Sequence, residues 1–209
     1  ADGLADHLYF ADLAGQAFRV DLNNNPVIGQ PTETDPNKDK EEINEAKKNV
    51  FGARTVTLFT EHKLNGLSPR FYEMPSVSVH TDTDTGGLFA AVAFSSGNRS
   101  APLADSTQSA NDGVFVVYDN DVIAKDLYAA DYSLNTTKAN TLKSLTIGGA
   151  VPRKTGNMFN AGWKHSFSST SGSYKGMNDI YALDGMLYVN VFHKDGTGIS
   201  GSCGGGVKG

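Results

Sequence analysis

The stretch HLYFADLAGQAFRVDL, residues 7–22, contains two short runs of alternating side chains on either side of a glycine. In the first run Leu8 and Phe10 share one face, and in the second run Phe18 and Val20 share one face. Alternation with a period of two is typical of β-strands, and a short glycine-containing loop between two such runs is typical of a hairpin. We therefore expect an antiparallel β-hairpin here.

The same pattern returns later and predicts an all-β protein. DIYALDGMLYVNVF repeats the order of aromatic strand, Asp, Gly turn and second aromatic strand, and LFAAVAFSSGNRSAPL followed by DGVFVVYDND is a looser version. The 23 glycines and the low share of charged residues, 20%, fit a turn-rich β-protein better than a helical one. Repeated antiparallel hairpins with Asp-Gly turns are typical of β-propeller blades.

Other elements follow from the same patterns. Further strands are expected over 55–59, 70–81 with an interruption at Pro75, 88–94, 114–118, 179–183 and 186–193, with a short strand near 142–147. The remainder of 120–162 is expected to be loop-rich. One helix is predicted, in the segment PNKDKEEINEAKKNV at 36–50, because proline and acidic residues open it and lysines lie near its end. Its apolar residues are few, so we expect a solvated surface helix around 37–50, inserted between strands.

Composition excludes several classes of partner. The net charge of −5 argues against nucleic acid and against an anionic membrane surface, and no run of about 18 apolar residues predicts a membrane span. Cys203 is the only cysteine, so no disulfide can form within these residues. It either pairs with a thiol outside them or is a buried spare thiol.

No catalytic motif is present, and we predict that the chain is not an enzyme. The sequence lacks G-x-S-x-G, H-E-x-x-H and G-x-x-x-x-G-K-[ST], and its five histidines are scattered. We interpret those histidines as strand-face or loop residues. Trp163, the only tryptophan, could stack on a sugar, but we favour a place in a core. We interpret Arg99 as structural, tying the carbonyls of its turn or a neighbouring carboxylate.

Five segments in a fixed order carry a resemblance to a known family. They are DGLADHLYFADLAGQAFRVDL, PRFYEMPSVSV, FSSGNRSAPL, GWKHSF, and DIYALDGMLYVNVFHKDG with SCGGG after it. Together they resemble the PilY-type (PilC/PilY) tip-associated adhesins of type IV pili, over most of the chain. Phe18 stands where that family usually has tryptophan.

The resemblance implies a place in the C-terminal β-propeller domain of such a protein. Residues 1–209 would then be one fragment with two to three antiparallel blades of an incomplete ring, completed by the rest of the propeller or by another chain. It also implies a secreted, non-enzymatic protein at the bacterial cell surface or pilus tip, with a role in pilus biogenesis and adhesion. Minor pilins and a host or surface receptor are the further partners that it implies.

The resemblance also implies a calcium loop in the opening turn. In such loops carboxylates alternate with a carbonyl ligand, and glycine occupies the sixth place. Asp2 would be the fifth position, the Leu4 carbonyl the seventh and Asp6 the ninth, with the first ligands upstream of residue 1. Bound Ca²⁺ would lock a hairpin and regulate pilus extension against retraction. From the residues alone the stretch also fits an ordinary Asp-Gly turn before a strand.

Other acidic turns are interpreted as plain turns, namely those at Asp82 with Asp84, at Asp112, and at Asp119 with Asp121. Two alternative functions remain open at this stage. Propellers also form quinone-dependent dehydrogenases, and others bind glycans.

Overall fold

The protein is built from short β-strands. The computed structural model describes residues 4–23, 53–64, 67–82, 86–103, 112–124, 127–128, 132–134, 142–145, 161–167, 174–193 and, for the backbone alone, 206–208. The strands are β1 (His7–Ala11), β2 (Gln16–Leu22), β3 (Ala53–Thr60), β4 (Ser76–Thr81), β5 (Leu88–Ser95), β6 (Gly113–Asp119), β7 (Lys143–Ser144), β8 (Gly162–Ser166), β9 (Tyr174–Gly176), β10 (Tyr181–Leu183), β11 (Met186–Tyr188), β12 (Val191–His193) and β13 (Gly206–Lys208). Within these ranges the one helical element is the 3-10 turn η2 (Asp121–Ile123). The prediction of an all-β class is confirmed.

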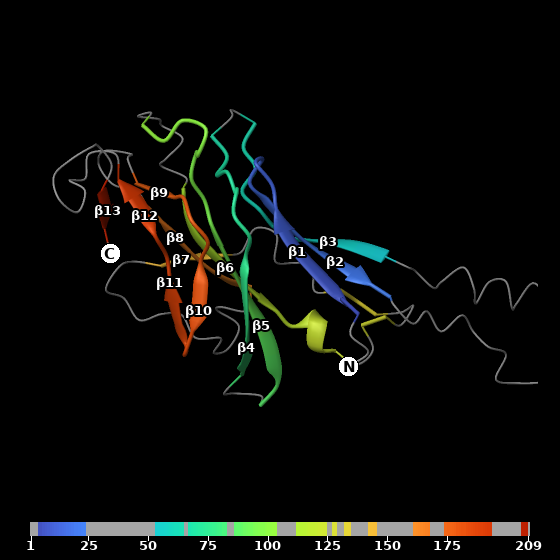
Figure 1. The fold of residues 1–209 in the computed structure, drawn as a ribbon. Helices are drawn as coiled ribbons and strands as arrows, with labels where there is room; N and C mark the ends of the chain where they lie inside the picture. The colour runs from blue at the N-terminus through green and yellow to red at the C-terminus, as the bar shows by residue number, and fades with distance from the viewer. Residues whose placement is uncertain are drawn as a thin grey trace, which may run out of the picture.

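The strands form four sheets, which Figure 1 shows in sequence colours. The first sheet has the order β1-β2-β3, and the central sheet has the order β4-β5-β6-β8-β7. The hairpin β10-β11 and the C-terminal sheet β13-β12-β9 complete the described part. All strand pairs are antiparallel except β7 with β8, which run parallel.

The hairpin predicted at residues 7–22 is confirmed as β1 and β2. Its turn is held by the Asp12 carboxylate, which accepts hydrogen bonds from the backbone N–H groups of Ala14 (3.0 Å) and Gln16 (2.8 Å). Gly15 adopts φ +89°, a backbone conformation that side chains with a Cβ rarely tolerate. The residue types in this turn therefore fix the register that places alternate β2 side chains on one face.

The first sheet packs over one face of the central sheet, and a phenylalanine cluster fills the space between them. Phe59 follows the bulge that shifts the β2–β3 register, and it stacks on Phe115 of β6 with ring centroids 5.5 Å apart. Phe71 and Phe94 meet Phe59 edge to face at 5.8 and 5.5 Å. Each buried phenylalanine contributes roughly 1.5–3 kcal/mol through burial of apolar surface.

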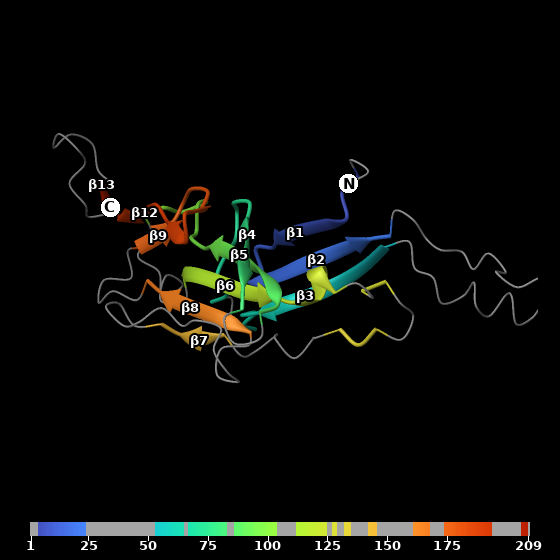
Figure 2. The ribbon, with the colours of Figure 1, turned by 90° about the horizontal axis from the view of Figure 1, so that it is seen from below.

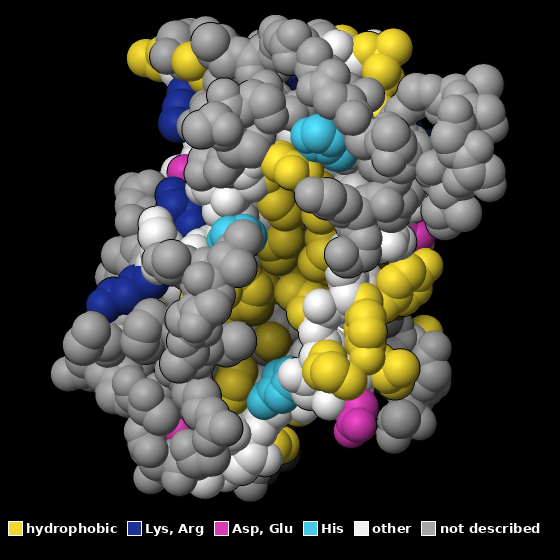
Figure 3. Space-filling view, turned by 90° about the vertical axis from the view of Figure 1, so that its left-hand side faces the viewer, with side chains coloured by type: hydrophobic (Ala, Val, Ile, Leu, Met, Phe, Trp, Pro, Cys, Tyr) yellow, Lys and Arg dark blue, Asp and Glu magenta, His cyan; other side chains and the backbone are white. Residues whose placement is uncertain are grey.

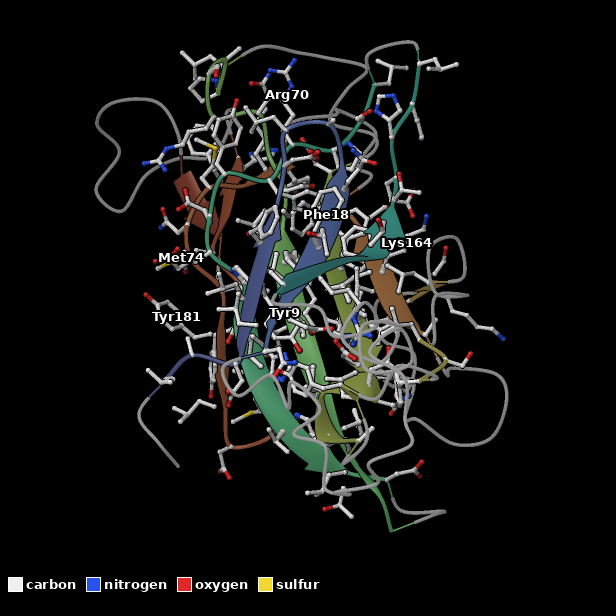
Figure 4. All side chains as sticks on the ribbon, turned by 90° about the vertical axis from the view of Figure 1, so that its right-hand side faces the viewer. Tyr9, Phe18, Arg70, Met74, Lys164 and Tyr181 are labelled. Carbon is white, nitrogen blue, oxygen red and sulfur yellow. The ribbon has the colours of Figure 1, made fainter. Side chains whose placement is uncertain are left out.

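An ion pair also joins these two sheets. Lys164 Nζ of β8 lies 2.5 Å from the Glu61 carboxylate, immediately after β3. Figure 4 shows Lys164 beside the end of β3, and it shows Tyr9 and Phe18 on the first sheet, which lies over the central sheet.

The opposite face of the central sheet carries a second apolar core. The buried members of this core are Phe89, Ala93, Val114, Val116, Tyr118 and Ile180. Leu187 of β11 and Val189 pack against it from the hairpin side, and Trp163 packs against it from β8. Figure 3 shows a stripe of apolar side chains on this side of the molecule. The central sheet is therefore covered on both faces, and Figure 2 shows the other sheets around it.

Several sequence predictions need correction. Residues 70–75 form no strand, and β4 begins only at Ser76, directly after Pro75, whose ring removes a backbone donor. The predicted strand over 186–193 is divided, because β11 pairs with β10 whereas β12 pairs with β9 and β13. The patterns predicted none of β8, β9 and β13. The predicted helix at 36–50 lies outside the described residues.

The propeller part of the fold prediction is not confirmed. The described sheets lie against one another, but these segments form no closed ring. The structure establishes an all-β chain with mainly antiparallel sheets.

Candidate functional site: a buried ionic cluster

An arginine is completely buried between the first sheet and the central sheet. Arg19 lies on β2, where Ala17, Arg19 and Asp21 alternate inward and are all fully buried. Arg19 Nε and Nη2 donate to the two carboxylate oxygens of Asp21, at 2.5 and 3.1 Å. A guanidinium and a carboxylate two residues apart on one strand face thus form a two-pronged pair.

The remaining side of the guanidinium faces the central sheet. Arg19 Nη1 donates to both carboxylate oxygens of Asp119, at 2.7 and 2.6 Å. Asp119 is the last residue of β6 and is fully buried. Arg19 therefore binds one carboxylate from each sheet and links the two sheets directly.

Neighbouring groups complete the coordination of both carboxylates. Arg54 of β3 donates to Asp21 Oδ2 from Nη2 (2.9 Å) and Nε (3.1 Å), and His7 Nδ1 lies 3.0 Å from Asp21 Oδ1. The Tyr9 hydroxyl donates to Asp119 Oδ2 at 3.2 Å. Every strand of the first sheet therefore contributes a side chain to the cluster.

The turn after β6 supplies the last members. The backbone N–H of Asp121 donates to Asp119 Oδ1 at 3.0 Å, and the Asp121 carboxylate lies 3.7 Å from Arg19 Nη1. The Tyr132 hydroxyl donates to Asp121 Oδ1 at 3.0 Å. We call this set the Arg19 cluster; it comprises His7, Tyr9, Arg19, Asp21, Arg54, Asp119, Asp121 and Tyr132.

Three members of the cluster, Tyr9, Arg19 and Asp21, have pKa values shifted away from the pH range of acid–base chemistry. Burial alone would raise the pKa of Asp21, but hydrogen bonds from His7 and Arg19, together with the charge of Arg19, hold that pKa well below its usual range. Burial would lower the pKa of Arg19, but hydrogen bonds from its carboxylate partners raise it above its usual range. Burial, and next the charge of Asp119, raise the pKa of Tyr9. A general acid or base needs a pKa near the working pH, so these groups are suited to holding a geometry.

The chemistry of the cluster is that of a lock between layers. A buried ion pair adds little stability beyond what apolar side chains of similar volume would give. Removing one partner, however, is costly, because it leaves an uncompensated buried charge. Arg19 can satisfy both carboxylates only when β2 and β6 face each other at one register. The cluster therefore favours one arrangement of the two sheets over others.

The predicted calcium ligands remain untested. Asp2 lies outside the described residues. Leu4 and Asp6 are exposed just before β1, and the Asp6 carbonyl accepts hydrogen bonds from Leu22 N (2.8 Å) and from the Tyr128 hydroxyl (3.4 Å). In the part of the chain that the structure describes, no group of three or more His, Cys, Asp or Glu side chains could hold a metal ion. The calcium loop stays a prediction.

Two of the acidic turns interpreted as plain turns are more than that. Asp119 and Asp121 belong to the Arg19 cluster, and Asp112 is 2% exposed at the start of β6. Asp82 is also buried, and its backbone closes the turn to Gly87. Sequence reasoning missed these residues because an Asp in a turn is usually solvated, and only a partner distant in sequence shows that it is buried.

Other candidate residues behave as predicted. Trp163 packs against the second apolar core, in agreement with its interpretation as a core residue. Arg99 Nη1 lies 2.5 Å from the carboxylate of Glu73, so it does tie a neighbouring carboxylate, although its side chain is 57% exposed. The described histidines lie on strand faces and in loops; His80, for example, stacks on Phe89 at 5.6 Å.

Comparison with protein-family models, curated proteins and solved structures finds no match to this chain. Among the described residues no helix is long and apolar enough to cross a membrane.

The predicted partners need correction. Completion of a ring by another chain or by the rest of a propeller was expected from unclosed blades, but the described sheets show no part of a closed ring. With no matching protein, nothing supports minor pilins or a host or surface receptor as partners either. These assignments are withdrawn.

Proposed function

We propose that this chain is a non-enzymatic, extracellular β-module of a PilY-type pilus protein, acting in type IV pilus biogenesis and adhesion. One observation carries the proposal. The segment FRVDL, part of the first and longest of the five resembling segments, supplies Arg19 and Asp21 to the buried cluster. The residues that carry the resemblance are therefore those that fix the layers of the fold.

The layered architecture supports the same proposal. Consecutive blades of a propeller pack face to face, and here the first sheet, the central sheet and the hairpin β10-β11 follow one another in the chain and cover each other's faces. We propose that these layers are successive blades. The Arg19 cluster would then act as the link between two of them.

A deletion experiment in the bacterium that encodes the chain tests the function. Loss of the gene should reduce the number of surface pili and the attachment of cells to a solid surface, and the wild-type gene should restore both. A complementing gene with Arg99→Met, at the exposed ion pair, serves as the matched control and should also restore both. Unchanged pili and attachment in the deletion strain would refute the proposal.

The calcium component is tested separately by isothermal titration calorimetry with CaCl₂, on a protein that includes the upstream residues where the first ligands are predicted. We expect binding that is lost in Asp6→Asn and in Asp2→Asn. Asp184→Asn is the control, because Asp184 occupies the left-handed region at φ 51° in the β10–β11 turn, which asparagine also tolerates. Equal binding by all four proteins would remove calcium from the proposal and leave the pilus assignment standing.

A further inference from the structure

A lysine is completely buried beneath the turn that follows β5. Lys175 of β9 is 0% exposed, and its Nζ donates to the backbone carbonyl of Pro102 at 2.8 Å. A Cβ added at Gly97 would lie 2.8 Å from Lys175 Cβ, so the backbone of the turn rests directly on this side chain. The lysine side chain therefore runs under residues 97–102, from one end of the turn to the other.

Two further polar side chains are buried at the same place. Asn98 belongs to that turn, is 9% exposed, and accepts a hydrogen bond from Ala101 N at its backbone carbonyl (3.3 Å). Asp112 is 2% exposed and accepts a hydrogen bond at Oδ1 from the Ser96 hydroxyl (3.1 Å). Its other oxygen, Oδ2, accepts no hydrogen bond from the part of the chain that the structure describes.

The backbone holds these elements together independently of the side chains. Gly176 N donates to the Ser96 carbonyl at 2.9 Å, and Gly113 N donates to the Ser96 hydroxyl at 3.0 Å. Residue 96 thus contacts both the strand that carries Lys175 and the strand that begins beside Asp112. A lysine, an asparagine and an aspartate are in this way buried around residues 96–102.

The pKa of Asp112 suits a group that takes up and returns a proton. Burial raises the pKa of Asp112 to about 6, against the opposing effects of the Ser96 hydroxyl and the charge of Lys175. Transfer of an Nζ proton to the Asp112 carboxylate would leave Lys175 as the neutral amine. A neutral amine is a nucleophile, and a protonated carboxyl group beside it can supply a proton.

We propose that Lys175 and Asn98 form an intramolecular isopeptide bond with Asp112 as the proton carrier. The Nζ lone pair attacks Asn98 Cγ, the Cγ–Nδ2 bond breaks, and one ammonia molecule leaves. Asp112 takes a proton from Nζ and gives one to the departing Nδ2, so it ends as it began. No atom changes oxidation state, and no co-reactant is needed.

The bond would join β9 of the C-terminal sheet to the turn after β5 of the central sheet. The link is covalent and lies in the part of the molecule opposite to the Arg19 cluster, with which it shares no residue. The proposal does not depend on the pilus assignment.

Intact-mass spectrometry of the purified, denatured full chain tests the proposal. The wild-type mass should be lower than the sequence mass by one ammonia molecule, and tandem spectra should show one branched peptide that joins residues 98 and 175. Lys175→Arg should have its full sequence mass. Asn98→Asp should lose water in place of ammonia and so give a product identical in mass to the wild type.

Each outcome decides a part of the proposal. A wild-type chain with its full sequence mass overturns the cross-link, and this result requires no variant to fold. Loss of one water molecule from the wild type would mean that Lys175 joins Asp112, which overturns the assignment to Asn98. In Asp112→Ala, checked for folding by circular dichroism, we expect the full sequence mass; a complete bond in that variant would overturn the role of Asp112.

Discussion

Replacement of Arg19 by methionine tests the Arg19 cluster most directly. Methionine keeps an unbranched apolar side chain, shorter than that of arginine, but removes every donor, so two buried carboxylates lose the guanidinium that pairs with both. Asp21 retains the Arg54 guanidinium, at 2.9 Å, whereas Asp119 retains the Tyr9 hydroxyl, at 3.2 Å, and one backbone N–H. Both carboxylates keep these partners but lose the guanidinium that joins them.

The magnitude follows from what is left uncompensated. Removing one partner of a buried ion pair costs about 3–5 kcal/mol, and because Asp21 keeps Arg54 we expect about 3–4 kcal/mol for Arg19→Met. A domain of this size has a free energy of unfolding of roughly 5–15 kcal/mol. At about 2–4 °C per kcal/mol, the melting temperature should fall by roughly 6–16 °C.

Urea unfolding followed by circular dichroism, with Arg99→Met as the matched control, measures this cost. Arg99 pairs with one carboxylate at 2.5 Å, but its side chain is 57% exposed, so the same substitution there should cost at most about 1 kcal/mol. Adding Asp21→Asn and Asp119→Asn to Arg19→Met should recover part of the loss, because the uncompensated charges are then gone. If Arg19→Met costs no more than Arg99→Met, the argument that the cluster locks the two sheets is refuted.

Three further predictions concern the same two sheets. The free energy of unfolding of the wild type should fall as the pH drops below about 4, because Asp21 takes up a proton in the unfolded chain at a higher pH than in the folded chain. In Asp21→Asn the free energy of unfolding should depend less steeply on pH, and an equal pH dependence would contradict the assignment. Gly162→Ala should cost at least about 3 kcal/mol in the same urea assay, because φ is +121° and the new Cβ would clash with the Val116 carbonyl oxygen of β6. Gly185→Ala should cost about 1–2 kcal/mol, because φ is +73° but the new Cβ meets nothing within 4 Å. Tyr9→Phe should cost about 1–2 kcal/mol, because it removes a donor to a buried carboxylate, and an unchanged urea midpoint would show that the 3.2 Å contact contributes nothing.

Local patterns predicted those elements whose stabilising contacts lie close together in the sequence. The first hairpin and the β10–β11 hairpin were predictable because alternation and turn chemistry both lie within a short stretch of chain. Strand β9 could not be predicted in this way. It is three residues long, and among the described residues it pairs only with β12, which comes much later in the chain.

The buried face of the first hairpin could not be predicted from alternation alone. Leu8 and Phe10 form the more apolar face of β1, yet they are 49% and 44% exposed. The opposite face of the hairpin, which carries Tyr9 and Arg19, is turned toward the central sheet. Hydrophobicity ranks the two faces in the wrong order, because a buried arginine becomes tolerable only when its carboxylate partners are supplied by distant strands.

The Arg19 cluster therefore shows what a sequence motif can and cannot convey. Spacing on one strand placed Arg19 and Asp21 on the same face, and this part could be inferred from the period of two. Asp119 is a hundred residues away from Arg19, and nothing in its turn distinguishes it from a solvated aspartate. The two residues pair only when β2 and β6 face each other. The charge balance that allows Arg19 to be buried is therefore a property of the layered fold. A resemblance based on such a motif therefore predicts the packing of layers more securely than it predicts a binding site, and the Arg19→Met comparison tests that packing without reference to any family.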